Sequence, residues 1–179
     1  LVWFYKKTNT GESVEGWHIT VYSDEACAQK VGTLITNEDG RAGYYLDPGT
    51  YWAKETGDEH GRFEDEYWMV DETVQKFEIK PHEDVSITFS NVQYGRLKIA
   101  KTVEGGGSVE GWQFKITDAE GKILDGSPFA TDEDGIILTG NLLPGTYTVE
   151  ELLPQDSLYE CTSENPQTVT VKQGEIAEV

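Results

Sequence analysis

Cysteine, methionine and histidine are scarce in this chain of 179 residues, with two, one and three copies respectively. Cys27 and Cys161 lie far apart and follow no spacing pattern, so we expect two partly buried, unpaired thiols. The histidines show no metal-ligand spacing, and no Ser-His-Asp or Cys-His arrangement can be assembled. The chain therefore lacks the signals of a disulfide-stapled fold, a zinc site or a common nucleophilic enzyme.

Basic residues are also few, with 14 Lys and Arg against 33 Asp and Glu, which gives a net charge of −19. Nucleic acids and anionic lipid surfaces are poor partners for such a surface. No apolar run reaches the length that spans a bilayer, and no signal peptide is visible. We therefore expect no nucleic-acid or membrane partner. Because residue 1 already reads as strand, we also expect a fragment of a longer protein.

The chain does contain an internal repeat. Three phrases recur at an offset of 95 or 96 residues: SVEGW (13–17 and 108–112), NEDG or DEDG (37–40 and 132–135) and PGTY (48–51 and 144–147). Several matches at offsets that differ by only one residue indicate two tandem copies of one module. We predict domains at 1–93 and 94–179, joined by a short and stiff connection.

Each copy reads as short strands separated by Gly, Pro and Asp turns. In DVSITFSN (84–91), for example, Val85, Ile87 and Phe89 alternate with polar residues. Period-two alternation of this kind predicts strands with one buried face. We therefore predict an all-β protein of two Ig-like sandwiches with about seven strands each. The acidic phrases TNEDG and TDEDG lack the spacing and distal Glu of a calcium loop, so we expect turns there and no metal or cofactor.

Three polar residues of the first copy lie on rows expected to face the core. Lys7 shares a face with Trp3 and Tyr5, Glu55 ends the strand that follows PGTY, and Asn91 lies behind Phe89. A lone buried lysine costs several kcal/mol unless it is neutral or paired. These side chains therefore form either an ordinary buried ion pair beside an amide, or a group of residues that react with one another.

The reactive alternative is a covalent cross-link. A neutral lysine amine attacks the side-chain carbonyl carbon of an asparagine and expels ammonia. An apolar pocket lowers the pKa of the amine below its usual value of about 10.4. A buried glutamate with a raised pKa then passes protons to the leaving nitrogen.

LDPGTYWAKE (46–55) and LLPGTYTVEE (142–151), together with the KT, VEGW and DG phrases, resemble the signature of Cna B-type domains. These SpaA-like or prealbumin-like domains occur in surface proteins and pilins of Gram-positive bacteria. The resemblance implies a spontaneous Lys–Asn isopeptide bond between the first and last strands. Matched by the KT phrase, Lys7 is the nucleophile, Glu55 the proton shuttle and Asn91 the electrophile. Counting back from Trp17 selects Lys6 as the nucleophile instead. Of the two alternatives, we favour Lys7.

The second copy matches less completely. Lys101 and Glu151 correspond to the lysine and the glutamate, whereas the adjacent Glu150 points outward by alternation from Tyr147. Aligning the two last strands sets Ile87 opposite Val179, so the expected Asn has no counterpart in the sequence. We therefore expect Lys101 to be unlinked and the last strand of this domain to be truncated.

The resulting hypothesis is a structural stalk or spacer of a bacterial cell-surface protein or pilin, located in the cell wall. It is not a turnover enzyme, because the bond forms once, and we expect a monomer that contacts neighbouring domains of the same protein. The alternative is an adhesin that binds a host protein or glycan through residues 57–68, an acidic and aromatic stretch. A transglutaminase-like ligase is disfavoured because a catalytic Cys-His pair is missing.

Overall fold

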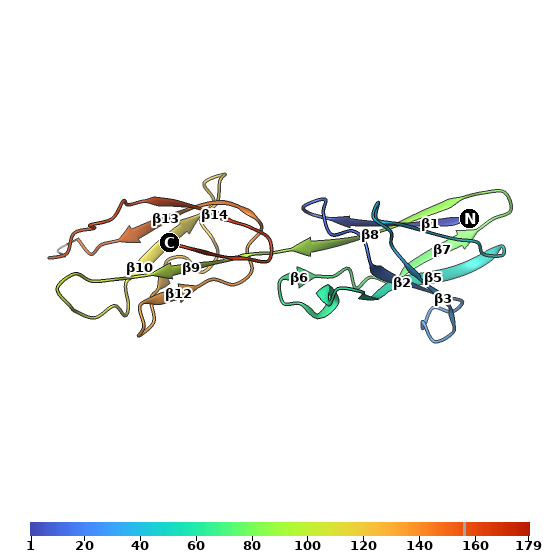
Figure 1. The fold of residues 1–179 in the computed structure, drawn as a ribbon, viewed down its shortest axis with the longest axis horizontal. Coiled ribbons are helices and arrows are strands. Elements are labelled where there is room, and N and C mark those ends of the chain that lie inside the picture. The colour runs from blue at the N-terminus through green and yellow to red at the C-terminus, as the bar shows by residue number, and fades with distance from the viewer. Residues whose placement is uncertain (156) are drawn as a thin grey trace. The chain divides into compact units, whose positions relative to one another are not determined.

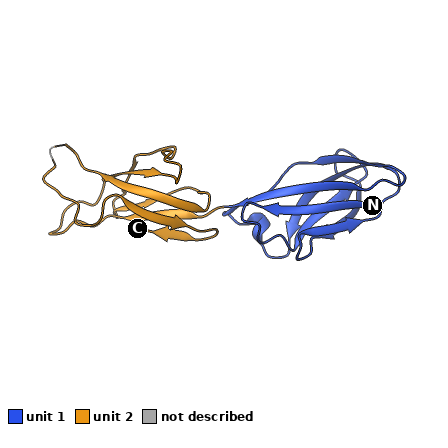
Figure 2. Cartoon of the chain, turned by 90° about the horizontal axis from the view of Figure 1, so that it is seen from above, with its two compact units in different colours: residues 1–93 blue, residues 94–179 orange. Residues whose placement is uncertain are grey.

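The computed structural model describes residues 1–155 and 157–179, which are almost entirely strand and loop (Figure 1). The chain divides into two compact units, Leu1–Gln93 and Tyr94–Val179 (Figure 2). The all-β prediction is confirmed. Within the described residues, no helix is long and apolar enough to cross a membrane.

The first unit is a sandwich of two four-stranded sheets, with orders β4-β1-β8-β6 and β3-β2-β5-β7. Its elements are β1 (Val2–Thr8), β2 (Trp17–Tyr22), β3 (Lys30–Ile35), β4 (Arg41–Tyr44), β5 (Gly49–Asp58), the 3₁₀ helix η1 (Arg62–Glu64), β6 (Trp68–Met69), β7 (Gln75–Ile79) and β8 (Val85–Gln93).

The second unit repeats this plan with sheet orders β12-β9-β15 and β11-β10-β13-β14. Its strands are β9 (Arg96–Ala100), β10 (Gln113–Thr117), β11 (Phe129–Ala130), β12 (Ile136–Leu138), β13 (Gly145–Leu152), β14 (Gln167–Val171) and β15 (Ile176–Glu178). The two free cysteines, Cys27 and Cys161, lie in different units.

The first and last strands of each unit are parallel neighbours in one sheet. In the first unit β1 pairs with β8, and Phe4 lies opposite Ile87. In the second unit β9 pairs with β15, and Leu97 lies opposite Ala177. A side-chain bond between the first and last strand would therefore join two adjacent strands.

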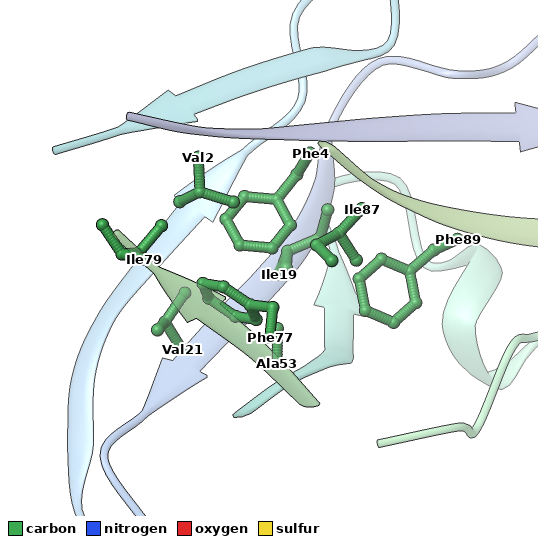
Figure 3. Close-up of a cluster of buried hydrophobic side chains, with 9 residues drawn as sticks. All are labelled: Val2, Phe4, Ile19, Val21, Ala53, Phe77, Ile79, Ile87 and Phe89. Carbon is green, nitrogen blue, oxygen red and sulfur yellow. The ribbon is translucent and has the colours of Figure 1, made fainter. Parts of the chain in front are cut away.

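The inward faces of the two sheets form the core of the first unit. Its side chains are apolar and nearly inaccessible to solvent (Figure 3): Val2, Phe4, Ile19, Val21, Ala53, Phe77, Ile79, Ile87 and Phe89. The alternation along β1 and β8 continues this buried row beyond Phe4 and Phe89, and the next inward positions are polar. The candidate site lies at these positions.

The repeated PGTY phrase begins β5 and β13 in the same way. The hydroxyl of Tyr51 donates to the carbonyl of Asp47 at 3.1 Å, and that of Tyr147 to the carbonyl of Leu143 at 2.7 Å. Each tyrosine hydroxyl thus forms a hydrogen bond with the turn that precedes its own strand. Because side chains on one face of a strand are two residues apart, an acid four residues later lies on the tyrosine's face.

Candidate functional site

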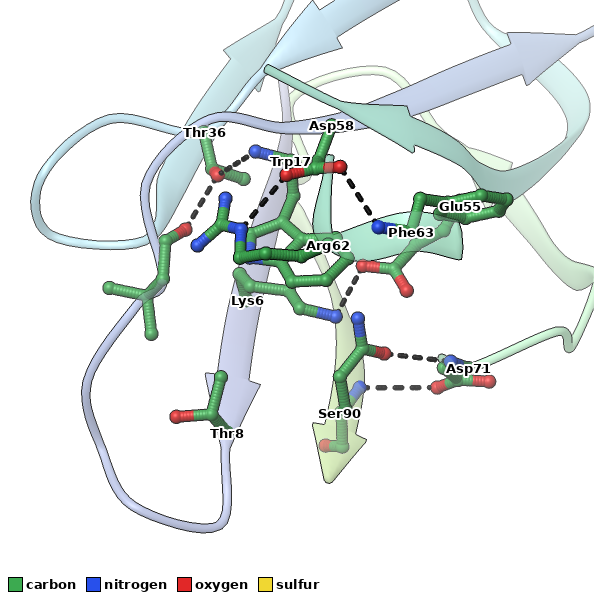
Figure 4. Close-up of polar contacts among 12 residues, drawn as sticks. Lys6, Thr8, Trp17, Thr36, Glu55, Asp58, Arg62, Phe63, Asp71 and Ser90 are labelled. Carbon is green, nitrogen blue, oxygen red and sulfur yellow. Dashed lines mark hydrogen bonds and ion pairs between the residues drawn. The ribbon is translucent and has the colours of Figure 1, made fainter. Parts of the chain in front are cut away.

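Lys6, Glu55 and Asn91 converge at one end of the first unit's core. Their residues are only 3%, 5% and 1% exposed. Lys6 comes from β1 and Asn91 from β8 in one sheet, while Glu55 comes from β5 in the facing sheet. Figure 4 shows Lys6 and Glu55 reaching toward each other across the sandwich, where they form an ion pair.

The expectation that Lys7 faces the core is wrong. Lys7 is exposed, and the buried row of β1 consists of Val2, Phe4 and Lys6. The main-chain N–H of Lys6 donates to Gly40 O at 2.7 Å, as that of Lys101 donates to Gly135 O at 2.8 Å. Lys6 is therefore the counterpart of Lys101, as the count from Trp17 indicated.

Burial governs the electrostatics of the Lys6–Glu55 pair. It lowers the pKa of Lys6 to about 8, although the Glu55 carboxylate acts in the opposite direction. It also raises the pKa of Glu55, against the effects of the Lys6 charge and of the nearby Asn91 amide. Both shifts favour the neutral amine and the neutral acid over the two charged groups.

Asn91 is held by one end of its amide. Its Oδ1 accepts a hydrogen bond from the main-chain N–H of Asp71 at 2.7 Å. Its Nδ2 has no hydrogen-bond partner among the described residues, and neither does Glu55 Oε2. These two buried atoms thus lack a well-formed hydrogen bond, although the Asn91 amide is close enough to Glu55 to lower the pKa of its carboxyl group. Unsatisfied buried polar atoms are unusual in a folded protein.

Aromatic rings cover the lysine. Lys6 Nζ lies 4.5 Å from the centre of the Trp17 ring, and Trp17 is fully buried. Trp68 packs edge-on against Trp17, with ring centres 5.4 Å apart. Trp68 belongs to β6, which pairs with β8 beyond Asn91. The rings exclude water from the amine and account for the strong effect of burial on its pKa.

An arginine completes this cover. The Arg62 guanidinium lies 4.4 Å from the centre of the Trp17 ring and donates to Asp58 Oδ2 at 2.9 Å. It also donates to the carbonyls of Ser13 and Glu15, at 2.7 and 2.5 Å. Residues 57–68 are therefore fastened over the site by internal contacts, a role that sequence reasoning missed. The only sign of this role in the sequence is that residues 57–68 form a longer stretch than the corresponding part of the second copy.

The second unit has a comparable lysine–glutamate pair. Lys101 Nζ lies 2.7 Å from Glu151 Oε1, and their side chains are 15% and 8% exposed. The Cys161 thiol donates to Glu151 Oε2 at 3.3 Å. Lys101 also lies 4.2 Å from the centre of the Trp112 ring. Lys101 is thus more accessible to solvent than Lys6, whose side chain is fully buried.

An asparagine equivalent to Asn91 does not occur among the residues of the second unit. The parallel register of β9 and β15 continues to Val179, whose N–H donates to the carbonyl of Lys98. Extending this register places the counterpart of Asn91 after Val179. Asn165 lines the same hollow as Lys101, but both ends of its amide bond to the main chain of Glu151. Glu150 points away and forms an ion pair with Lys115.

Both units have the fold of a prealbumin-like domain. A model of the SpaA family, described as a prealbumin-like fold domain, matches residues 2–93 and again residues 95–179. The chain belongs to this family, and the resemblance drawn from the sequence is confirmed. No curated protein sequence matches the chain.

The chain is similar to several solved structures. The Bacillus anthracis TIE protein is 24% identical with a TM-score of 0.51, and the match covers 99% of this chain and 32% of that one. A streptococcal ancillary pilin is 18% identical with a TM-score of 0.42, covering 99% and 61%. GBS52, the minor pilin of Streptococcus agalactiae, is 18% identical with a TM-score of 0.40, covering 99% and 92%. The chain thus spans about a third of the TIE chain.

Proposed function

We propose that this chain is a load-bearing module of a bacterial surface protein or pilin, and that its first domain is closed by an isopeptide bond between Lys6 and Asn91. The observation that carries the proposal is the burial of an amine, a carboxyl group and an amide together, with the amide nitrogen unpartnered. Membership of the SpaA family supports a structural role. The cell-surface location follows from the family resemblance.

The chemistry uses the three side chains in fixed roles. The neutral Lys6 amine attacks Cγ of Asn91, so that a carbon–nitrogen bond forms and Oδ1 gains negative charge. Protonated Glu55 donates a proton to Asn91 Nδ2, which leaves as ammonia when the Cγ–Nδ2 bond breaks. Glu55 regains a proton from the former Lys6 amine. The product is a neutral amide beside a neutral carboxyl group. The two charges of the Lys6–Glu55 ion pair therefore no longer lie in the core.

The bond can be observed directly by peptide mapping. Protease digestion of the purified chain should release a branched peptide that joins residue 6 to residue 91. In Glu55→Gln the side chain keeps its shape but cannot donate an acid proton, so the two peptides should separate. Recovery of two separate peptides from the wild-type chain would overturn the proposal.

The rate of bond formation should show a bell-shaped dependence on pH. The reactive form carries one proton on the pair, with Lys6 neutral and Glu55 protonated. Below the raised pKa of Glu55 the pair gains a second proton and the amine stays charged. Above the pKa of Lys6, about 8, the pair loses the proton that Glu55 must donate.

This profile can be measured by following the mass of newly synthesised chain at pH 4 to 10. A rate that falls on both sides of neutral pH supports Glu55 as the proton shuttle. A rate that keeps rising above pH 8 and then stays constant would show that the free amine reacts without it.

The adhesin hypothesis places ligand contacts on residues 57–68. In the structure Asp58 and Arg62 are engaged with the domain itself, and Trp68 is buried. These contacts favour a cover for the bond-forming site over a free recognition loop.

A further inference from the structure

The electrophile of the proposed bond, Asn91, is held by Asp71, which is not one of the three reacting residues. The main-chain N–H of Asp71 donates to Asn91 Oδ1 at 2.7 Å, and Asn91 is buried. When the Lys6 amine adds to Cγ, negative charge develops on this oxygen. A preorganised N–H at 2.7–3.1 Å from a developing oxyanion is a recurrent means of stabilising such transition states.

The Asp71 side chain fixes the position of this N–H. Its Oδ2 accepts from the main-chain N–H of Ser90 at 3.2 Å (Figure 4). Ser90 directly precedes Asn91 on β8. Asp71 Oδ1 accepts from Thr73 N at 3.1 Å and from Thr73 Oγ1 at 2.6 Å. The Asp71 carboxylate thus takes the place of a strand partner for β8 just after β6 ends. The main-chain N–H of Asp71 remains available to bind the Asn91 side chain.

The charge of Asp71 does not explain its presence at the site. It raises the pKa of Glu55, which favours the protonated shuttle, but it also raises the pKa of Lys6, which disfavours the neutral amine. These two electrostatic effects oppose each other in the reaction. The hydrogen bonds of the Asp71 side chain do not oppose each other in this way, because all of them hold its main-chain N–H against Asn91.

We propose that Asp71 belongs to the bond-forming site: its main-chain N–H stabilises the oxyanion on Asn91, and its carboxylate is the positioning group for that N–H. This inference rests on the proposed Lys6–Asn91 bond. It predicts that Asp71 affects how fast the bond forms, while the three reacting side chains determine whether it forms.

The test is the rate at which newly synthesised full-length chain loses the mass of ammonia, sampled at intervals from a cell-free translation reaction. Asp71→Ala removes the carboxylate and should slow the loss by about 10- to 100-fold, since the N–H is no longer held. Asp71→Asn removes the charge but keeps an acceptor oxygen, and should restore much of the rate. Asp39→Ala is the matched control, because Asp39 is an exposed turn acid whose carboxylate pairs with Arg41, and it should react at the wild-type rate.

The outcomes separate this inference from the proposal beneath it. If the wild-type chain and Asp39→Ala react and Asp71→Ala reacts equally fast, the role of Asp71 is overturned and the bond stands. If the wild-type chain never loses mass, the bond and this inference fail together.

A purely structural role has a different signature. Unfolding midpoints of the Asp71 variants, measured in a Lys6→Ala background, report stability without the bond. If Asp71→Asn slows the reaction as much as Asp71→Ala, with equal losses of stability, the positioning role is overturned.

Should Asp71→Ala fail to fold, Asp71→Asn and Thr73→Ala supply the comparison. Thr73→Ala removes one of the hydrogen bonds to Asp71, so a modest slowing is expected, and a wild-type rate would count against the inference.

Discussion

Stretched by its two ends, the chain should show one unfolding event, which comes from the second domain. In the first domain, force enters along β1, crosses from Lys6 to Asn91 through the proposed bond and leaves along β8, because these strands are parallel neighbours. Residues 7–90 then carry no load. Without the bond, the same force would pull β1 and β8 apart and unfold the sandwich.

The expected signal is a count of length increments in single-molecule force spectroscopy. The segment from residue 6 to residue 91 contains 86 residues (91 − 6 + 1), so its release would add about 300 Å of chain at 3.3–3.6 Å per residue. The wild-type chain should show one increment of this size and Lys6→Ala should show two. Two such increments from the wild-type chain would contradict a covalently closed first domain.

Replacing Lys6 should also cause the largest loss of thermal stability of any substitution in β1. Closing a loop of 86 residues is worth about 4–5 kcal/mol by the chain-entropy estimate made for disulfides. Lys6→Ala removes this constraint, because without the Lys6 amine the bond cannot form. For a domain of this size the midpoint of the first unit should fall by roughly 20 °C or more.

Lys7→Ala is the matched control for this measurement. Lys7 is adjacent in sequence, of the same type and exposed, so its removal should change the free energy of unfolding by less than about 0.5 kcal/mol. Differential scanning calorimetry resolves the two variants. Equal midpoints for Lys6→Ala and wild type would show that no constraint had been lost.

The sequence carried enough information for the fold and for most of the site. The offset of the repeated phrases and the alternation of β8 placed Asn91 on a buried row, and PGTY placed Glu55 and Glu151 on the face of their tyrosines. These positions follow from local periodicity. The same periodicity applies to both domains, so Lys101 was located as well.

Lys7 was wrongly placed on the buried face of β1, because the match of the KT phrase was given more weight than the repeat offset. The KT phrase aligns Lys7 with Lys101, whereas the offset of 95 residues aligns Lys6 with it. A slip of one residue moves every side chain of a strand to the other face. Both faces of β1 carry aromatic residues, so hydrophobicity alone could not decide between them.

Asp71 and Arg62 could not be found from the pattern. Asp71 lies in a loop and Arg62 in the short 3₁₀ helix η1, and neither segment shows periodicity. Both residues meet the site through contacts 19 to 49 residues apart in sequence. Such contacts depend on how loops close over the ends of the sheets. Only the three-dimensional arrangement shows that these charged residues are fastened to the domain instead of facing a ligand.

The central claim is tested most directly by the intact mass of the purified chain. The wild-type chain should weigh about 17 Da less than its sequence requires, the mass of one ammonia expelled when the amide forms. Lys7→Ala should keep this deficit, whereas Lys6→Ala and Asn91→Ala should have their full calculated masses. A wild-type chain at its full calculated mass would contradict the account, and a deficit of about 34 Da would contradict its assignment of a single bond to the first domain.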